Sequence, residues 1–147
     1  MVGQLVLLGL LFVAGLPGFG RLVPHLLTDW ALLAIGAALM LIGGVAVMAG
    51  LRDLGPSLTP MPRPRVGATL VEDGVYAVIR HPIYAGLIVG GLGWSAVTRS
   101  LPATAVALLL GIYFDLKSRR EEAWLTDHYP GYDAYRRRTR RFVPWIY

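Results

Sequence analysis

The sequence predicts an all-α integral membrane protein with about four transmembrane helices, a helical hairpin and a C-terminal interfacial helix. Of its 147 residues, 55% are hydrophobic and only 16% are charged, whereas a soluble domain has about 25% charged residues. Charged residues are scarce mainly within long apolar runs, which indicates that lipid surrounds much of the chain. An ordinary soluble enzyme is therefore excluded, and we expect a single domain over residues 1–147.

Four apolar runs define the predicted spans, at residues 2–19, 30–51, 82–97 and 101–116. A helix needs about 20 residues to cross a bilayer, so the first two runs are the clearest spans. A cleavable signal peptide is the alternative for the first run, but no basic segment precedes it. The last two runs form a tight hairpin with Pro102 in the first turn of its second arm. Good helix formers should carry that arm on to about His128.

Two polar segments connect or follow these spans: a loop at residues 52–81, interrupted by prolines, and a tail at residues 117–147. Together they hold twelve of the fourteen Lys and Arg residues. Cytoplasmic segments of membrane proteins are enriched in Lys and Arg, so both segments and both termini are expected on the cytoplasmic side. The net charge of +5 is then a sign of topology and of contact with anionic lipid, and not of nucleic-acid binding.

Contacts between helices should use glycine, because small residues let helix backbones approach closely in lipid. The glycines expected at such contacts are Gly36, Gly43, Gly44, Gly86, Gly90 and Gly93.

The sharpest local motif is GVYAVIRHPIYAG at residues 74–86, where the polar loop meets the third apolar run. His81 precedes a proline and Pro82 suits a first helical position, so a helix should begin at Pro82. Its first N–H groups would be donors with partial positive charge beside Arg80 and His81, which predicts an anion-binding corner. The alternative is that Arg80 and His81 reach the interface beside an aromatic belt of Tyr76 and Tyr84.

The polar end of the fourth run carries two adjacent acids, Glu121 and Glu122. Pairing with neighbours three or four residues away, such as Lys117 and Arg119, is the simplest explanation for their presence. Both acids are nevertheless predicted on the same membrane face as the cationic corner. Cations at one end and carboxylates at the other would suit a zwitterion, such as the amino-acid end of a cofactor.

The tail predicts a short interfacial helix after Gly131. Tyrosines at spacings of three would form one aromatic stripe: Tyr129, Tyr132 and Tyr135. The arginines of residues 136–141 would then face headgroups or phosphate. Residues 142–145 would return the chain to the membrane and cover a cavity at its surface.

In combination, these motifs resemble the isoprenylcysteine carboxyl methyltransferase family, including its prokaryotic relatives and the related phospholipid methyltransferases. The resemblance extends from Leu51 to Pro144 and is carried by Gly74, Tyr76, Arg80, His81, Pro82, Tyr84, Gly86, Glu121, Glu122, Leu125, Tyr129, Tyr132, Tyr135 and Pro144. It implies an integral membrane methyltransferase of a prokaryotic plasma membrane, without a soluble nucleotide-binding domain. S-adenosylmethionine would be the cofactor and S-adenosylhomocysteine the product.

The resemblance also implies a cofactor site at the cytoplasmic face. The residues expected to bind the cofactor are Tyr76, Arg80, His81, Pro82, Tyr84, Leu87, Glu121 and Glu122. The cofactor carboxylate would lie near Arg80 and His81, and the ammonium near Glu121 or Glu122. Adenine would lie in an apolar pocket touching Tyr76, Tyr84 or Leu87.

The acceptor implied is lipophilic, prenylated or another lipid, and would arrive from the bilayer. A carboxylate acceptor needs no base, but only a cation to orient it, for which Arg80 or an arginine of the tail such as Arg136 is the candidate. An amine or hydroxyl would need a base, for which Glu121 or Glu122 is the candidate. The family leans towards a carboxylate.

Two alternatives remain open. A membrane reductase of the steroid-reductase type has a similar Tyr-rich tail and would bind NADPH through the arginine run. A non-enzymatic membrane protein would use its basic tail to bind anionic lipid or a partner. No metal is expected, since the chain has no cysteine and its three histidines are scattered.

Overall fold

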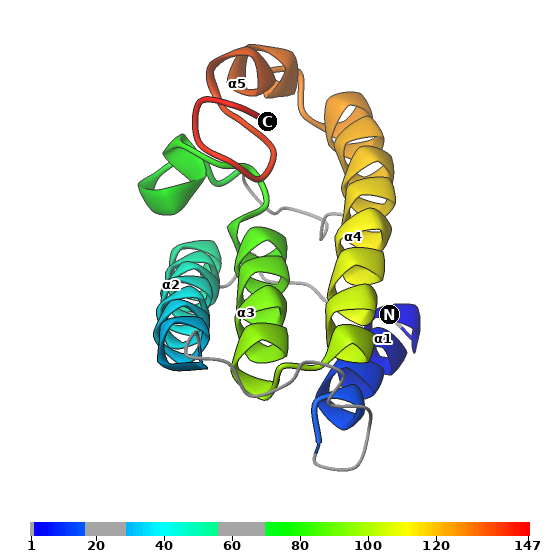
Figure 1. Cartoon of the computed structure of the whole chain (residues 1–147). Helices are drawn as coiled ribbons and strands as arrows, with labels where there is room; N and C mark the ends of the chain where they lie inside the picture. Colours follow the sequence, from blue (N-terminus) through cyan, green and yellow to red (C-terminus); the bar gives the residue numbers. More distant parts are fainter. Residues whose placement is uncertain (1, 17–28, 56–69) are drawn as a thin grey trace. The chain divides into compact units, whose positions relative to one another are not determined.

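The computed structural model describes residues 2–16, 29–55 and 70–147. They belong to two compact units: residues 1–45 with 86–113, and residues 46–85 with 114–147. The helices, in chain order, are α1 (Val2–Ala14), α2 (Asp29–Leu54), the short 3-10 helix η2 (Gly74–Ala77), α3 (Pro82–Thr98), α4 (Leu101–His128) and α5 (Tyr132–Arg138) (Figure 1). The predicted proline-rich part of the loop, at residues 56–64, lies outside the described residues.

The prediction of an all-α chain is confirmed for the described residues. The helix α3 begins at Pro82 and α4 continues to His128, both as predicted. The helix α2 ends at Leu54, three residues beyond the predicted span, so the loop starts later than expected. This polar end of α2 has a partner, because the Asp53 carboxylate accepts a 2.8 Å hydrogen bond from the Val75 backbone N–H.

Membrane-spanning capacity differs among the helices. Within the described part of the chain, α2 from Trp30 to Leu54 and α4 are long and apolar enough to cross a membrane. The helices α1 and α3 are apolar but have only 13 and 17 residues. The end of the predicted first span, at residues 17–19, lies outside the described residues. Two candidate spans are therefore found, and crossing by α1 and α3 stays a prediction.

In the first unit, α2 and α3 run side by side and meet at glycines (Figure 1). A Cβ atom added at Gly43 would lie 2.5 Å from the Gly86 carbonyl oxygen, and one at Gly36 would lie 2.8 Å from that of Gly93. The predicted glycine contacts are therefore confirmed at these positions. Gly44 was predicted wrongly, because an added Cβ there meets open space.

The hairpin between α3 and α4 turns at Arg99, whose φ of 53° is left-handed. Ser100 follows and caps α4, because its Oγ accepts a hydrogen bond from the Ala103 N–H at 3.2 Å. The same hydroxyl donates to the Ala14 carbonyl at the end of α1, at 2.6 Å. Ser100 thus joins α1 to the hairpin within the first unit.

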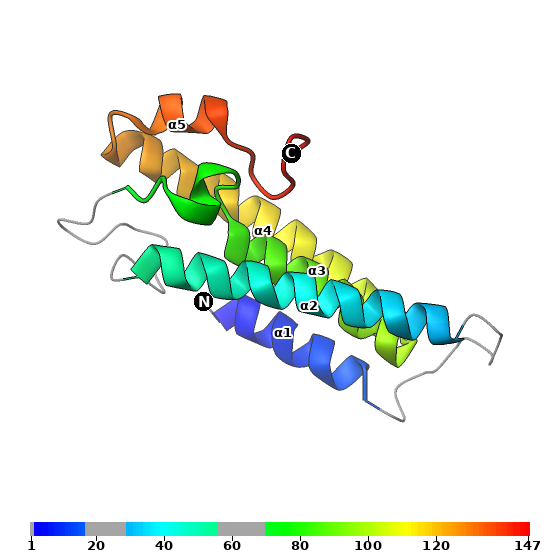
Figure 2. The ribbon, with the colours of Figure 1, turned by 90° about the vertical axis from the view of Figure 1, so that its left-hand side faces the viewer.

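In the second unit, α5 (Figure 2) is joined to η2 by a buried tyrosine. Tyr132 and Tyr135 are almost fully buried, and the Tyr135 hydroxyl donates to the Tyr76 carbonyl oxygen at 2.8 Å. A parallel bridge between Ile79 and Arg140 adds backbone hydrogen bonds nearby. The predicted helix after Gly131 is confirmed, but its tyrosines face the interior of the unit, and Tyr129 precedes the helix.

Candidate active site

A buried carboxylate, Glu122, lies at the centre of the second unit. Its side chain is 3% exposed and accepts hydrogen bonds from two arginines. Arg80 Nε lies 2.9 Å from Oε1, while Arg141 binds both oxygens, with Nε 3.1 Å from Oε1 and Nη2 2.9 Å from Oε2. Charges buried this deeply require such partners, because removing an ion from water costs several kcal/mol. Glu122 therefore joins α4 to the segments on which both arginines lie.

Arg80 also holds the end of α5. Its Nη1 donates to the Thr139 carbonyl at 2.7 Å and to the Arg136 carbonyl at 3.2 Å. The last carbonyls of a helix lack partners within the helix and carry partial negative charge, so a cation stabilises them. The arginine of the RHP motif thus connects α3, α4 and α5.

Arg141 extends the cluster towards the end of the apolar stretch of α4. Its Nη1 lies 3.1 Å from Asp115 Oδ1 and 2.9 Å from the Tyr147 hydroxyl. The hydrogen bond with Glu122 raises the pKa of Arg141 well above its usual range, so the guanidinium stays charged. Sequence reasoning named the arginine run but missed Asp115 and Tyr147. A seven-residue spacing places Asp115 on the same helix face as Glu122, and this signal could have identified it.

His81 lies between the two glutamates and is nine-tenths buried. Its Nδ1 is 3.8 Å from a Glu121 oxygen, and its Nε2 is 3.3 Å from a Glu122 oxygen. Although it is close to Glu122, Nε2 is not aligned for a hydrogen bond and has no hydrogen-bond partner. Buried polar atoms are seldom left in this state, which makes Nε2 a candidate contact for a ligand beside Glu122.

Glu121 has different neighbours from Glu122. It accepts hydrogen bonds from the Tyr84 hydroxyl at 2.8 and 3.0 Å, and Lys117 Nζ lies 3.8 Å away. The Tyr84 ring stacks between His81 and Phe114, with ring centroids 5.4 and 4.5 Å apart. The two adjacent acids therefore share His81 but differ otherwise, since Glu122 lies beside arginines and Glu121 beside Tyr84 and Lys117.

Five of the predicted site residues come together in this cluster: Arg80, His81, Tyr84, Glu121 and Glu122. Arg136 lies at its edge, with Nε 3.8 Å from a Glu122 oxygen and a side chain that is 52% exposed. Among the arginines of residues 136–141, Arg141 makes the close contact with Glu122, at 2.9 Å.

The other predicted residues have different surroundings. Tyr76 is buried and donates to the Gly50 carbonyl at 3.3 Å; its burial and the nearby Asp53 charge raise its pKa to about 12. Pro82 is buried at the start of α3. Leu87 is half-buried and belongs to the first unit.

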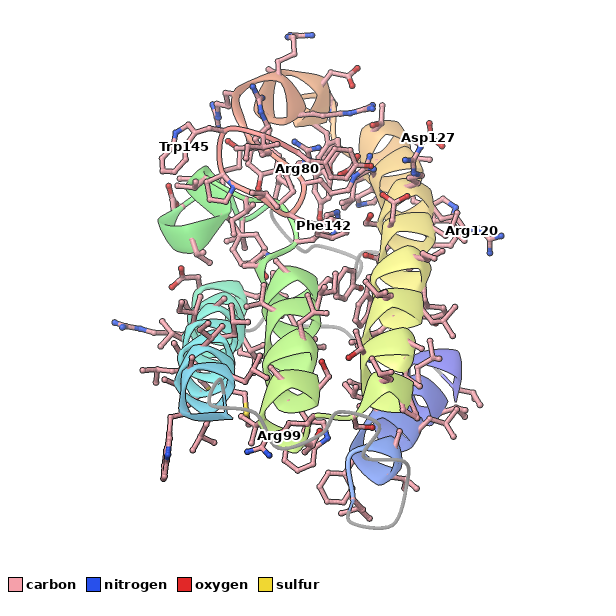
Figure 3. All side chains as sticks on the ribbon, viewed as in Figure 1. Arg80, Arg99, Arg120, Asp127, Phe142 and Trp145 are labelled. Atoms are coloured by element: carbon pink, nitrogen blue, oxygen red, sulfur yellow. The ribbon has the colours of Figure 1, made fainter. Side chains whose placement is uncertain are left out.

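The predicted anion corner offers fewer donors than the sequence suggested. The Ala85 N–H donates to the His81 carbonyl at 3.0 Å, so one of the first three N–H groups of α3 is already bonded. The polar groups of this corner are mainly side chains, among them Arg80, which Figure 3 labels. Among the described residues, no group of three His, Cys, Asp or Glu side chains could hold a metal ion.

Comparison with known proteins places the chain in a family. Residues 31–131 match the family described as phospholipid methyltransferase, and the chain belongs to that family. The cobalt-zinc-cadmium resistance protein CzcN of Cupriavidus metallidurans is 40% identical over 81 residues, 54% of this chain and 38% of the relative. The nickel-cobalt-cadmium resistance protein NccN of Alcaligenes xylosoxydans xylosoxydans is 34% identical over 119 residues, which is 80% of this chain and 55% of the relative.

A third relative is named for an activity. The protein-S-isoprenylcysteine O-methyltransferase of Schizosaccharomyces pombe is 33% identical over 79 residues, which is 52% of this chain and 34% of the relative. The chain spans about a third to a little over half of the length of these three relatives. The resemblance predicted from the RHP and Glu-Glu motifs is confirmed by these matches.

Proposed function

We propose that this protein is an integral membrane methyltransferase that transfers the methyl group of S-adenosylmethionine to a lipophilic acceptor at the cytoplasmic face. One observation carries the proposal: the RHP segment, the Glu-Glu pair and the tail arginine form one buried cluster in a chain of the phospholipid methyltransferase family. A prokaryotic plasma membrane, cytoplasmic termini and a single domain over residues 1–147 are parts of the same proposal.

The residues of the cluster fit the amino-acid end of this cofactor. His81 Nε2 is a buried nitrogen without a hydrogen-bond partner, and the Glu121 carboxylate lies 3.8 Å from Nδ1, on the other side of the same ring. A cofactor ammonium would be held by Glu121, and its carboxylate by His81 or by an arginine of the cluster. The half-buried Tyr84 remains a candidate for contact with adenine.

The chemistry asks for alignment and exclusion of water more than for strong bases. The sulfonium of the bound cofactor supplies an activated methyl group. Arg80 and Arg141 lie beside Glu122 and can orient an acceptor oxygen, with Arg136 at the edge of the cluster. A carboxylate acceptor loses no proton, so no base is needed. Glu122, whose charge is balanced by Arg80 and Arg141, can therefore have a structural role.

The acceptor that we favour is a prenylated carboxylate, as the name of the fission yeast relative suggests. A bilayer location would deliver such an acceptor, and the exposed apolar faces of the first unit are consistent with that location. Large side chains that are more than half exposed there include Leu5, Phe12, Ile35, Leu41, Ile42, Leu108 and Ile112. In lipid these side chains need no further cover.

A transfer assay with radiolabelled S-adenosylmethionine tests this proposal. The purified protein in nanodiscs would be given S-farnesylcysteine with a free carboxylate, or the same compound as its carboxamide. We expect methyl transfer to the carboxylate alone, and loss of that transfer in His81→Ala. Equal labelling of both compounds would point to another acceptor atom. No labelling of any extracted lipid or added acceptor by folded protein would overturn the proposal.

A further inference from the structure

The C-terminal loop at residues 142–147 presents large apolar side chains to the outside. Trp145 is 87% exposed and Ile146 is 79% exposed, whereas Phe142 is half-buried and contacts the His81 ring. Figure 3 shows Trp145 pointing away from the ribbon and Phe142 pointing towards the interior of the unit. Contiguous exposed apolar side chains of this size can mark a contact surface.

The shape of this loop is set by its own backbone. The N–H groups of Phe142 and Val143 both donate to the Tyr147 oxygen, at 2.8 and 2.7 Å, and the Tyr147 N–H donates back to the Val143 carbonyl. Trp145 has a φ of 63°, a conformation that residues other than glycine rarely adopt. The outward direction of Trp145 is therefore part of a defined turn.

The Tyr147 side chain fixes the loop to α4 near the point where the apolar stretch of that helix ends. The Tyr147 hydroxyl donates to Asp115 at 2.8 Å and accepts from Arg119 at 3.0 Å. Asp115 and its neighbour Leu116 end the apolar stretch of α4. If α4 crosses the bilayer, this point is the boundary between acyl chains and headgroups, where tryptophan is enriched in membrane proteins.

We infer that loop 142–147 is an interfacial anchor that inserts Trp145 and Ile146 into the headgroup boundary of an anionic bilayer. Arg140, which directly precedes Arg141 and the loop, is exposed and complements anionic headgroups. Tyr147 and Arg141 connect the anchor to Glu122, so lipid contact supports the candidate site directly. The inference rests on the membrane location contained in the proposed function.

Tryptophan fluorescence of the full chain in vesicles tests the anchor. The protein would be reconstituted in phosphatidylcholine and phosphatidylglycerol with brominated phosphatidylcholine as quencher, in wild-type and Trp145→Phe forms. The difference between the two emissions isolates Trp145. We expect bromolipid to quench that difference emission and aqueous acrylamide to leave it largely unquenched. Both effects should be weaker when phosphatidylglycerol is omitted. Trp124→Phe is the matched control for removing a tryptophan.

Two results would overturn the inference. One is a difference emission that acrylamide quenches and bromolipid does not. The other is protection that grows with the protein-to-lipid ratio without bromolipid quenching, which would mean that a second copy of the chain covers the loop. The tryptophans that remain in Trp145→Phe report the membrane location itself. If bromolipid quenches them while Trp145 stays in water, the anchor fails and the membrane location stands.

Discussion

The helices of the first unit meet backbone to backbone at glycines, whereas the segments of the second unit meet through charged side chains. Gly43 and Gly36 allow contacts that no Cβ atom would fit, while Glu122 is buried between Arg80 and Arg141. Apolar side chains gain little by leaving lipid for a helix interface, so shape decides the first kind of packing. Charge compensation decides the second kind. Changes in size should therefore affect the first unit most, and changes in charge the second.

The largest effect is expected from Glu122→Gln. This change leaves Arg80 and Arg141 buried without a counter-charge, and breaking a buried pair costs about 3–5 kcal/mol. Chemical unfolding in detergent measures the loss. Glu121→Gln is the comparison variant, because Glu121 accepts hydrogen bonds from Tyr84, lies near Lys117 and His81, and pairs with neither arginine, so a smaller loss is expected. Equal losses from both changes would refute the central position of Glu122.

A smaller effect is expected from Gly43→Ala in the first unit. The added methyl group meets the backbone of α3, which cannot yield as a side chain can, and such overpacking costs about 1–3 kcal/mol. Gly44→Ala meets open space and should be neutral or slightly stabilising, since alanine favours a helix by about 1 kcal/mol. Thermal unfolding of both variants provides the comparison, which fails if Gly44→Ala is the more damaging change.

An effect of about 1 kcal/mol is expected when Tyr135→Phe removes the hydrogen bond to the Tyr76 carbonyl. Burial raises the pKa of Tyr135 above its usual value of 10.0. The neutral hydroxyl therefore stabilises the fold fully below about pH 10, and that contribution is lost as the pH rises further. Unfolding measured between neutral and alkaline pH should show a weaker alkaline loss in Tyr135→Phe. Identical pH profiles would contradict this assignment.

The smallest effect is expected from Arg136→Gln. Its side chain is half-exposed and lies 3.8 Å from Glu122, and exposed pairs contribute about 0–1 kcal/mol. Arg141→Gln removes two close hydrogen bonds from Glu122 and should cost clearly more. Parallel unfolding curves rank the two variants. A larger loss of stability in Arg136→Gln than in Arg141→Gln would mean that Arg136 is the main partner of Glu122 in the tail.

Much of the fold could be predicted because its signals are local. Pro82 marks the start of α3, and the good helix formers after Leu116 carry α4 to His128. The extent of α2 was underestimated, because Asp53 finds its partner at Val75, 22 residues away, and no local pattern shows that contact. Gly44 was misplaced for a similar reason, since composition does not say which glycine faces α3.

The candidate site was predicted in its residue types but not in its pairing. Motifs brought Arg80, His81 and the Glu-Glu pair into one hypothesis, and they lie together in the second unit. The choice of Arg141 over Arg136 depends on the turn after α5, where Thr139 is extended and ends the helix. The attachment of Tyr147 to Asp115 depends on the same turn. Such choices follow from tertiary structure and not from spacing.

Calorimetric binding of S-adenosylhomocysteine to the purified protein in detergent tests the central claim most directly. Wild-type protein should bind, and His81→Ala should bind at least about tenfold more weakly, the equivalent of about 1.4 kcal/mol. Gly44→Ala, which changes the first unit at an open position, should bind as wild type does. The absence of binding to folded wild-type protein, or equal binding by His81→Ala, would contradict the assignment of the second-unit cluster as the cofactor site.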